Sequence, residues 1–316
     1  MPALVTNAWA AWLPDPLTRR HFSRLIVEGY GDLTGYLRSV SPVRVAFIAP
    51  GAELNMPPAV LPVYDGIVEE VAIREEPAGV TAEARLAEPA GARLTLMKGT
   101  PARAVVDFSA APLVALLRRR VVVLDAGHGS PDPGGLGPID LLEKNVVLDM
   151  VLRLEKLVEQ AGGIPLLTRR GDAGPAADAR AEVVREARPV AVISLHTHWS
   201  PDPRVKGFAV YYHRESARPL AEAIRTNLSR KLALSDRGLY PAAGPPFSPS
   251  AHQPGHSLHQ TDNGLGAPTV TVETVTISNP VEEGWLRSCV FRQRVAQAVF
   301  NGLASHLRVT NPGPRA

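Results

Sequence analysis

From residue 121 onward, short apolar runs alternate with helical patterns, and this rhythm restricts the possible folds more than any other feature of the chain. The expected strands cover residues 121–125, 164–168, 189–198, 206–213 and 268–277. Helices are expected over the segments 143–163, 176–188, 216–234 and about 282–308. Such alternation predicts an α/β domain with a mostly parallel sheet flanked by helices. In domains of this kind, active sites gather at the carboxyl ends of the strands.

The first of these expected helices has a clear apolar face. Its apolar positions recur at helical spacing and are Val147, Met150, Val151, Leu154 and Val158. Two glycines, at positions 162 and 163, follow as a stop signal.

The chain before residue 110 follows a different pattern. Short, roughly alternating runs are separated by Pro, Gly and Asn, as strands and turns require. These runs cover residues 43–50, 66–76, 80–89, 92–99 and 102–109. They predict an all-β, sandwich-like domain over residues 1–110. Residues 111–120 are expected to link it to an α/β domain over residues 121–310.

Composition excludes several classes of protein. The net charge of +3 is small for 316 residues, so nothing argues for a nucleic-acid partner. The single cysteine, Cys289, excludes an intrachain disulfide and a cysteine-rich zinc site. No apolar run reaches the roughly 18 residues of a transmembrane helix, so stable membrane insertion is not expected. The N-terminal stretch lacks a basic region ahead of its short apolar part, so no export signal is visible.

Three side chains that can bind a metal fall where this architecture places chemistry. His128 follows the first strand between two glycines, Glu143 opens the first helix, and His196 lies near the end of the third strand. A turn histidine and a glutamate near a helix N-terminus both have ordinary explanations. His196 is harder to dismiss, because a buried polar ring requires partners. Together, two imidazoles and one carboxylate match a catalytic zinc site, in which three protein ligands leave a fourth position for water.

Four further residues are candidates for the same site. Glu273 lies in a strand of Val and Thr, where a carboxylate is costly to bury unless it faces a cleft or a cation, so it is a candidate general base. The alternative is an outward position on an edge strand. His198 is either a partner of the site, an oxyanion donor or a solvent-facing histidine. Arg237 either contacts an anionic substrate group or lies on the surface, and Asp125 either orients a ligand or caps the loop after it.

A Pro-, Gly- and His-rich segment, residues 241–264, interrupts the alternation. It is typical of a long ordered loop that borders a site. Its histidines either rim a pocket or have no role; they are His252, His256 and His259.

Six separated motifs occur in an order that resembles the zinc-dependent N-acetylmuramoyl-L-alanine amidases of the Amidase_3 type. They are VVVLDAGHGSPDPGG, EKN, TRRGD, ISLHTH, DRGL and APTVTVETVTISNP. The resemblance spans about residues 120–308. It implies zinc ligation by His128, Glu143 and His196, with Glu273 as the catalytic glutamate. The implied reaction is hydrolysis of the amide between the lactyl group of N-acetylmuramic acid and the L-alanine of the stem peptide. Peptidoglycan would then be the partner, and the location the bacterial cell envelope or the extracellular space.

The chain departs from the family pattern in four places. The segment GLGPIDLLEK lacks the usual second glycine before the EK pair, and His198 stands where the family often has Asn. Thr-Val-Thr follows Glu273 where a Gly-Phe pair is common, and the segment 241–264 is peculiar to this chain. None of these departures removes an implied zinc ligand.

The N-terminal part is similar to the AMIN-type β module, which often precedes such amidases. The stretches YDGIVEEVAIREE and GTPARAVVDFS carry this similarity. It implies a domain that targets the chain to envelope material.

Two other functions fit the sequence. The first is a non-catalytic cell-wall-binding protein that retains the amidase domain as a scaffold, and the second is a zinc peptidase that cuts elsewhere in the stem peptide. The sequence leaves open the form of the substrate, the oligomeric state and the need for an activator protein.

Overall fold

The computed structural model describes residues 2–14, 21–87, 89–109, 114, 116–242 and 266–310. The chain divides into two compact units, Met1–Ala115 and Leu116–Ala316, and each is described by itself. None of the helices in these described ranges is long and apolar enough to cross a membrane.

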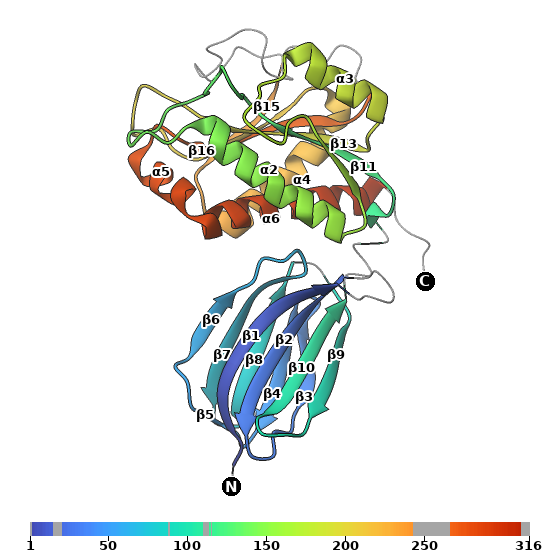
Figure 1. The fold of residues 1–316 in the computed structure, drawn as a ribbon, viewed down its shortest axis with the longest axis vertical. Coiled ribbons are helices and arrows are strands. Elements are labelled where there is room, and N and C mark those ends of the chain that lie inside the picture. Colours follow the sequence, from blue (N-terminus) through green and yellow to red (C-terminus); the bar gives the residue numbers. More distant parts are fainter. Residues whose placement is uncertain are drawn as a thin grey trace. The chain divides into compact units, whose positions relative to one another are not determined.

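The first unit is built on two five-stranded sheets (Figure 1). One sheet has the order β5-β1-β2-β10-β9, with strands β5 (Glu53–Leu54), β1 (Leu4–Pro14), β2 (His21–Tyr30), β10 (Ala102–Ser109) and β9 (Ala92–Met97). The other has the order β3-β4-β8-β7-β6, with strands β3 (Tyr36–Ser41), β4 (Arg44–Pro50), β8 (Gly79–Leu86), β7 (Val68–Glu76) and β6 (Ala59–Pro62). Side chains from both sheets join one hydrophobic cluster, for example Leu25 and Val27 of β2 with Val71 and Ile73 of β7. Apolar residues at every second position therefore give each sheet an inward face.

The second unit contains a six-stranded sheet in the order β12-β11-β13-β16-β14-β15. Its strands are β11 (Val121–Ala126), β12 (Ile164–Leu167), β13 (Ala191–His198), β14 (Phe208–Tyr212), β15 (Asp236–Pro241) and β16 (Thr269–Thr276). β11 runs parallel to β12 and β13, β13 parallel to β16, and β14 parallel to β15. β14 runs antiparallel to β16, so the sheet is mixed. The carboxyl ends of β11, β13 and β16 consequently share one edge.

Helices cover both faces of this sheet (Figure 1). On one face α6 contacts both α2 and α4, and α3 packs against β11 on the other. The helices are α2 (Glu143–Gln160), α3 (Ala177–Ala187), α4 (Arg218–Leu232), α5 (Pro280–Arg287) and α6 (Cys289–Thr310). The apolar face expected for α2 is confirmed, because its five periodic residues are fully buried. α2 ends just before Gly162, whose φ is +76°.

The expected single helix over 282–308 is wrong, because the segment forms two helices. Ser288 adopts an extended conformation between α5 and α6 and breaks the helical path. Its hydroxyl accepts a hydrogen bond from the backbone N–H of Phe291, 3.3 Å away. Serine is favoured at this capping position because its oxygen satisfies an N–H that has no partner within the helix. Helix α5 begins in the same way, because the Asn279 side chain accepts hydrogen bonds from the backbone N–H groups of Val281 and Glu282.

Candidate metal centre

His128 lies in the turn that follows β11. Its φ of +61° is left-handed, a conformation that a non-glycine residue adopts only when its surroundings hold it there. The ring Nδ1 lies 2.7 Å from Oδ2 of Asp132, which fixes the orientation of the imidazole. Nε2 on the opposite side of the ring lies 3.1 Å from Oε1 of Glu143. A metal-binding histidine commonly has a carboxylate hydrogen-bonded to the ring nitrogen that does not face the metal, and Asp132 occupies that position beside His128.

Glu143 is the first residue of α2, and its side chain is fully buried. Both of its oxygens are held by the backbone. Oε1 accepts a hydrogen bond from the N–H of Thr197 at 2.8 Å, and Oε2 accepts one from the N–H of Gly135 at 2.7 Å. The carboxylate is therefore fixed in place by the residues on either side of the site.

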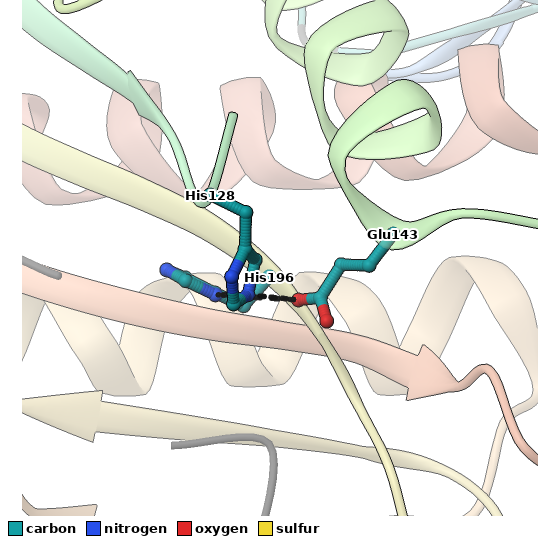
Figure 2. A group of neighbouring side chains, drawn as sticks. All are labelled: His128, Glu143 and His196. Carbon is teal, nitrogen blue, oxygen red and sulfur yellow. Dashed lines mark hydrogen bonds and ion pairs between the residues drawn. The ribbon is translucent and has the colours of Figure 1, made fainter. Parts of the chain in front are cut away.

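His196 lies near the end of β13 and completes a group of three. Its Nδ1 is 3.1 Å from Nε2 of His128 and 3.3 Å from Oε1 of Glu143. Figure 2 shows the three side chains pointing toward one another from a turn, a helix start and a strand. The structure thus brings together the three side chains that the sequence singles out as metal ligands, in a group that can hold a metal ion.

The spacing of these three atoms fits a zinc ion. Zinc ligands about 2.0–2.1 Å from the metal in a tetrahedron lie roughly 3.3–3.4 Å from one another. The three separations in the cluster are 3.1, 3.1 and 3.3 Å. Two imidazoles and one carboxylate are also a donor set that zinc prefers, whereas magnesium and calcium favour oxygen ligands.

The charged groups of the cluster shift one another's pKa values. Burial lowers the pKa of His128, but the carboxylates of Glu143 and Asp132 outweigh it and raise that pKa to about 10. Burial favours the neutral form of Glu143, yet the charge of His128 and hydrogen bonds from both histidines hold its pKa well below the usual range. Glu143 is therefore ionised, which is the form that binds a metal cation.

Glu273 lies on β16 directly beside His196, its partner in the parallel register. Its side chain is buried, and three polar atoms lie at the same distance from its Oε2. The Tyr211 hydroxyl, an Arg237 Nη2 and the His198 Nδ1 each lie 3.2 Å from it. Burial and the negative charge of Glu273 raise the pKa of Tyr211, so this hydroxyl keeps its proton and donates. The structure thus brings His198 and Arg237 to the same carboxylate.

Asp125 occupies a different place from the candidate ligands. Its fully buried carboxylate accepts hydrogen bonds from Thr168 and Ser194, both at 2.5 Å, and from Arg180 at 2.6 Å. These contacts join β11, β13 and α3 beneath the site. The carboxylate that contacts Nδ1 of His128 is instead Asp132, which no sequence motif indicates. Its position four residues after His128 is the only signal in the sequence that could have indicated it.

Tyr211 is the second residue of the site that the sequence analysis missed. It lies on β14, a strand that was expected, but its role depends on antiparallel pairing with β16. In that register Tyr211 stands opposite Thr271, two residues before Glu273. Residues two apart on a strand face the same side, so the hydroxyl reaches the Glu273 carboxylate. A sequence pattern alone does not reveal the pairing.

The segment GLGPIDLLEK, which departs from the family pattern, is held by a helix from the other end of the chain. The buried carboxylate of Glu283 on α5 accepts hydrogen bonds from the N–H groups of Ile139 and Leu141. A Cβ on Gly137 would meet this carboxylate at 2.6 Å, so the close approach depends on glycine. The expected loop 241–264, with its three histidines, lies almost entirely outside the described residues.

Gly127 has a specific steric role beside His128. A Cβ at this position would overlap the ring of His196, so the glycine makes room for that ring. We expect Gly127→Ala to displace His196 and to weaken the binding of a metal ion by the candidate ligands by about tenfold or more. Gly171→Ala is the matched control, because an added Cβ there meets no atom within 4 Å. Competition titration with a zinc chelator measures both variants, and equal affinities would contradict this role.

The family model for N-acetylmuramoyl-L-alanine amidases matches residues 122–305. The chain belongs to this amidase family. The probable cell wall amidase LytH of Staphylococcus epidermidis is 30% identical over 192 residues, which are 60% of this chain and 59% of the relative. The N-acetylmuramoyl-L-alanine amidase LytC of Bacillus subtilis is 28% identical over 191 residues, which are 59% of this chain and 35% of the relative. The match therefore spans less than two thirds of these curated amidases.

Solved amidase structures have a similar fold. The amidase AmiC2 of Nostoc punctiforme superposes with a TM-score of 0.53 at 27% identity, over 61% of this chain and 99% of that one. The catalytic domain of the amidase CwlV of Paenibacillus polymyxa gives a TM-score of 0.53 at 28% identity, over 60% of this chain and 99% of that one. The matched family segment lies within the second unit, Leu116–Ala316.

Proposed function

We propose that the chain is a zinc-dependent N-acetylmuramoyl-L-alanine amidase that cleaves peptidoglycan between N-acetylmuramic acid and L-alanine. The observation that carries this proposal is the triangle of His128 Nε2, His196 Nδ1 and Glu143 Oε1, with sides of 3.1 to 3.3 Å. Its support is the match of residues 122–305 to the amidase family.

The three residues of the triangle would hold the zinc ion and leave its fourth position open. A bound zinc supplies Lewis acidity, which polarises a carbonyl and lowers the pKa of a water molecule to about 7. The surrounding chain supplies rigidity: Asp132 orients His128, and backbone N–H groups hold Glu143. Such partners keep the ligands in place without rearrangement during the reaction.

Glu273 would act as the general base and then as the general acid. It would accept a proton from the attacking water and deliver it to the leaving amine of L-alanine. Its position beside His196 supports this role. Tyr211, Arg237 and His198 all approach Oε2, which leaves Oε1 to take the proton. Arg237 and His198 would thus orient the base.

The contribution of Tyr211 is testable by removal of one oxygen. We expect Tyr211→Phe to lower kcat by about tenfold, because a buried hydrogen bond to a carboxylate is lost. Tyr212→Phe is the matched control, since the next residue on a strand faces the opposite side. Steady-state kinetics on soluble muropeptides measures both. An unchanged kcat for Tyr211→Phe, or an equal loss in Tyr212→Phe, would rule out the proposed orientation of Glu273.

The first unit would be an AMIN-like module that targets the chain to the cell envelope. Two five-stranded sheets around a single hydrophobic cluster support this proposal. An envelope or extracellular location is also supported by the relatives, two of which carry the names cell wall amidase and N-acetylmuramoyl-L-alanine amidase.

The proposed function is tested by making hydrolysis depend on zinc. Purified peptidoglycan is incubated with protein that has been stripped by a chelator, and then with the same protein after zinc is restored. We expect soluble fragments only when zinc is present. Binding to sacculi with no release in either state would favour the non-catalytic wall-binding protein. Release that persists in fully stripped protein would contradict the zinc mechanism.

A further inference from the structure

Arg169, from the TRRGD motif, lies buried behind the candidate metal centre and binds only backbone in the contacts described. Its Nε donates to the carbonyl of Ala126 at 2.9 Å, and its Nη1 donates to that of Gly171 at 2.8 Å. Its Nη2 donates to two carbonyls, those of Gly127 and Lys144, both at 2.8 Å. The residue is 6% exposed, and its bonds to Ala126 and Gly127 are shielded from water.

The two carbonyls that share Nη2 belong to the segments that carry two of the candidate ligands. Gly127 immediately precedes His128, and Lys144 immediately follows Glu143. One nitrogen atom thus bridges the turn after β11 and the first turn of α2. Because both bonds are 2.8 Å long, the guanidinium sets how far apart these two backbone segments lie.

The third ligand is joined to the same framework through a second buried arginine. Nη2 of Arg180 donates to the carbonyl of His128 at 2.6 Å, and Nη1 donates to Asp125 at 2.6 Å. Asp125 also accepts a hydrogen bond from Ser194, which lies two residues before His196 on β13. The position of each ligand-bearing segment is therefore defined relative to the others by hydrogen bonds beneath the site.

Only an arginine can make the contacts of Arg169. Its planar guanidinium directs several donors at fixed angles, whereas a lysine ammonium is a single point charge on a flexible stem. A lysine at this position keeps the positive charge and can reach one or two of the carbonyls. It cannot bridge the turn and the helix while also binding Ala126 and Gly171.

We propose that Arg169 is a positioning residue that sets the spacing between His128 Nε2 and Glu143 Oε1 and thereby the affinity of the chain for zinc. The proposal rests on the proposed function, because it assumes that these two atoms bind the metal. In the contacts described, Arg169 reaches none of the candidate ligands' side chains. Its effect is transmitted through the backbone of the two segments.

The test compares Arg169→Lys with Arg170→Lys in the full chain. Arg170 is the next residue in the same motif, but its side chain is 63% exposed and pairs with Glu155. Zinc affinity is measured by competition with a chromogenic chelator, and the absorption spectrum of the cobalt-loaded protein reports ligand geometry. We expect Arg169→Lys to bind zinc about 10- to 100-fold more weakly and to shift the cobalt spectrum. Arg170→Lys should match the wild type in both.

Circular dichroism and thermal unfolding of the metal-free proteins show whether each variant is folded. A folded Arg169→Lys variant with wild-type zinc affinity and cobalt spectrum would overturn the proposal. Arg169→Gln provides a second variant; if both variants are unfolded without metal, Arg169 is a determinant of folding and the positioning role is wrong. A wild-type protein that binds no zinc would refute the proposed function as well. Zinc binding by the wild type with equal affinity in the variants would refute the positioning role alone.

Discussion

Replacing Glu273 with glutamine is expected to lower kcat by about 100- to 10,000-fold, the range over which general acid–base catalysis contributes. The amide keeps the shape of the side chain but cannot accept the proton of the attacking water. Zinc binding should be unchanged, because Glu273 lies beside the candidate metal-binding triangle without belonging to it. Steady-state kinetics and zinc content of the same preparation measure the two effects separately.

Glu222→Gln is a suitable control, since Glu222 is an exposed carboxylate on α4. It should retain full activity and full zinc content. A Glu273→Gln variant with wild-type kcat would show that another group moves the proton. Loss of zinc from this variant would mean that Glu273 belongs to the metal site instead.

The second large effect is expected for His196→Ala. Removal of one of three protein ligands should abolish stoichiometric zinc binding and reduce hydrolysis by far more than the roughly 10- to 100-fold typical of partners outside the ligand set. The backbone should be retained, because β13 is held on both sides by β11 and β16. Metal analysis after dialysis, together with circular dichroism, measures binding and folding.

His213→Ala is the matched histidine control for this variant. His213 follows β14 in the same unit, and its Nε2 contacts the Thr271 hydroxyl at 3.0 Å, away from the triangle. Its loss should leave zinc content unchanged. The assignment of His196 as a ligand would be refuted if His196→Ala retained one zinc per chain, or if His213→Ala lost zinc equally.

Much of the second unit follows from patterns that are local in sequence. The apolar face of α2 and the apolar runs of β11 and β13 are complete within each segment, so periodicity predicts them. β15 was not expected, because Gly238 and Pro241 within it are residues that strands usually avoid. In the first unit, β2 was missed although it alternates: Leu25 and Val27 are buried, while Arg24 and Glu28 on the other face are partly exposed.

The candidate site likewise contains residues that local sequence patterns predict and contacts that they do not. His128, Glu143 and His196 stand at the ends of predictable elements, and the carboxyl ends of parallel strands bring such residues together. The contacts of Arg169 with Gly127 and of Tyr211 with Glu273 join positions 42 and 62 apart in the chain. They depend on the order of strands in the sheet and on the path of each turn. Neither is encoded in a pattern that can be recognised within one segment.

The central claim is tested most directly by the products that the zinc-loaded protein releases from purified peptidoglycan. Mass spectrometry of the fragments distinguishes the three functions that fit the sequence. The proposed amidase activity predicts stem peptides that begin with a free L-alanine amine, together with glycan strands whose muramic acid carries a free lactyl carboxylate. Fragments in which L-alanine remains attached to muramic acid would identify a peptidase and contradict the proposed amidase activity.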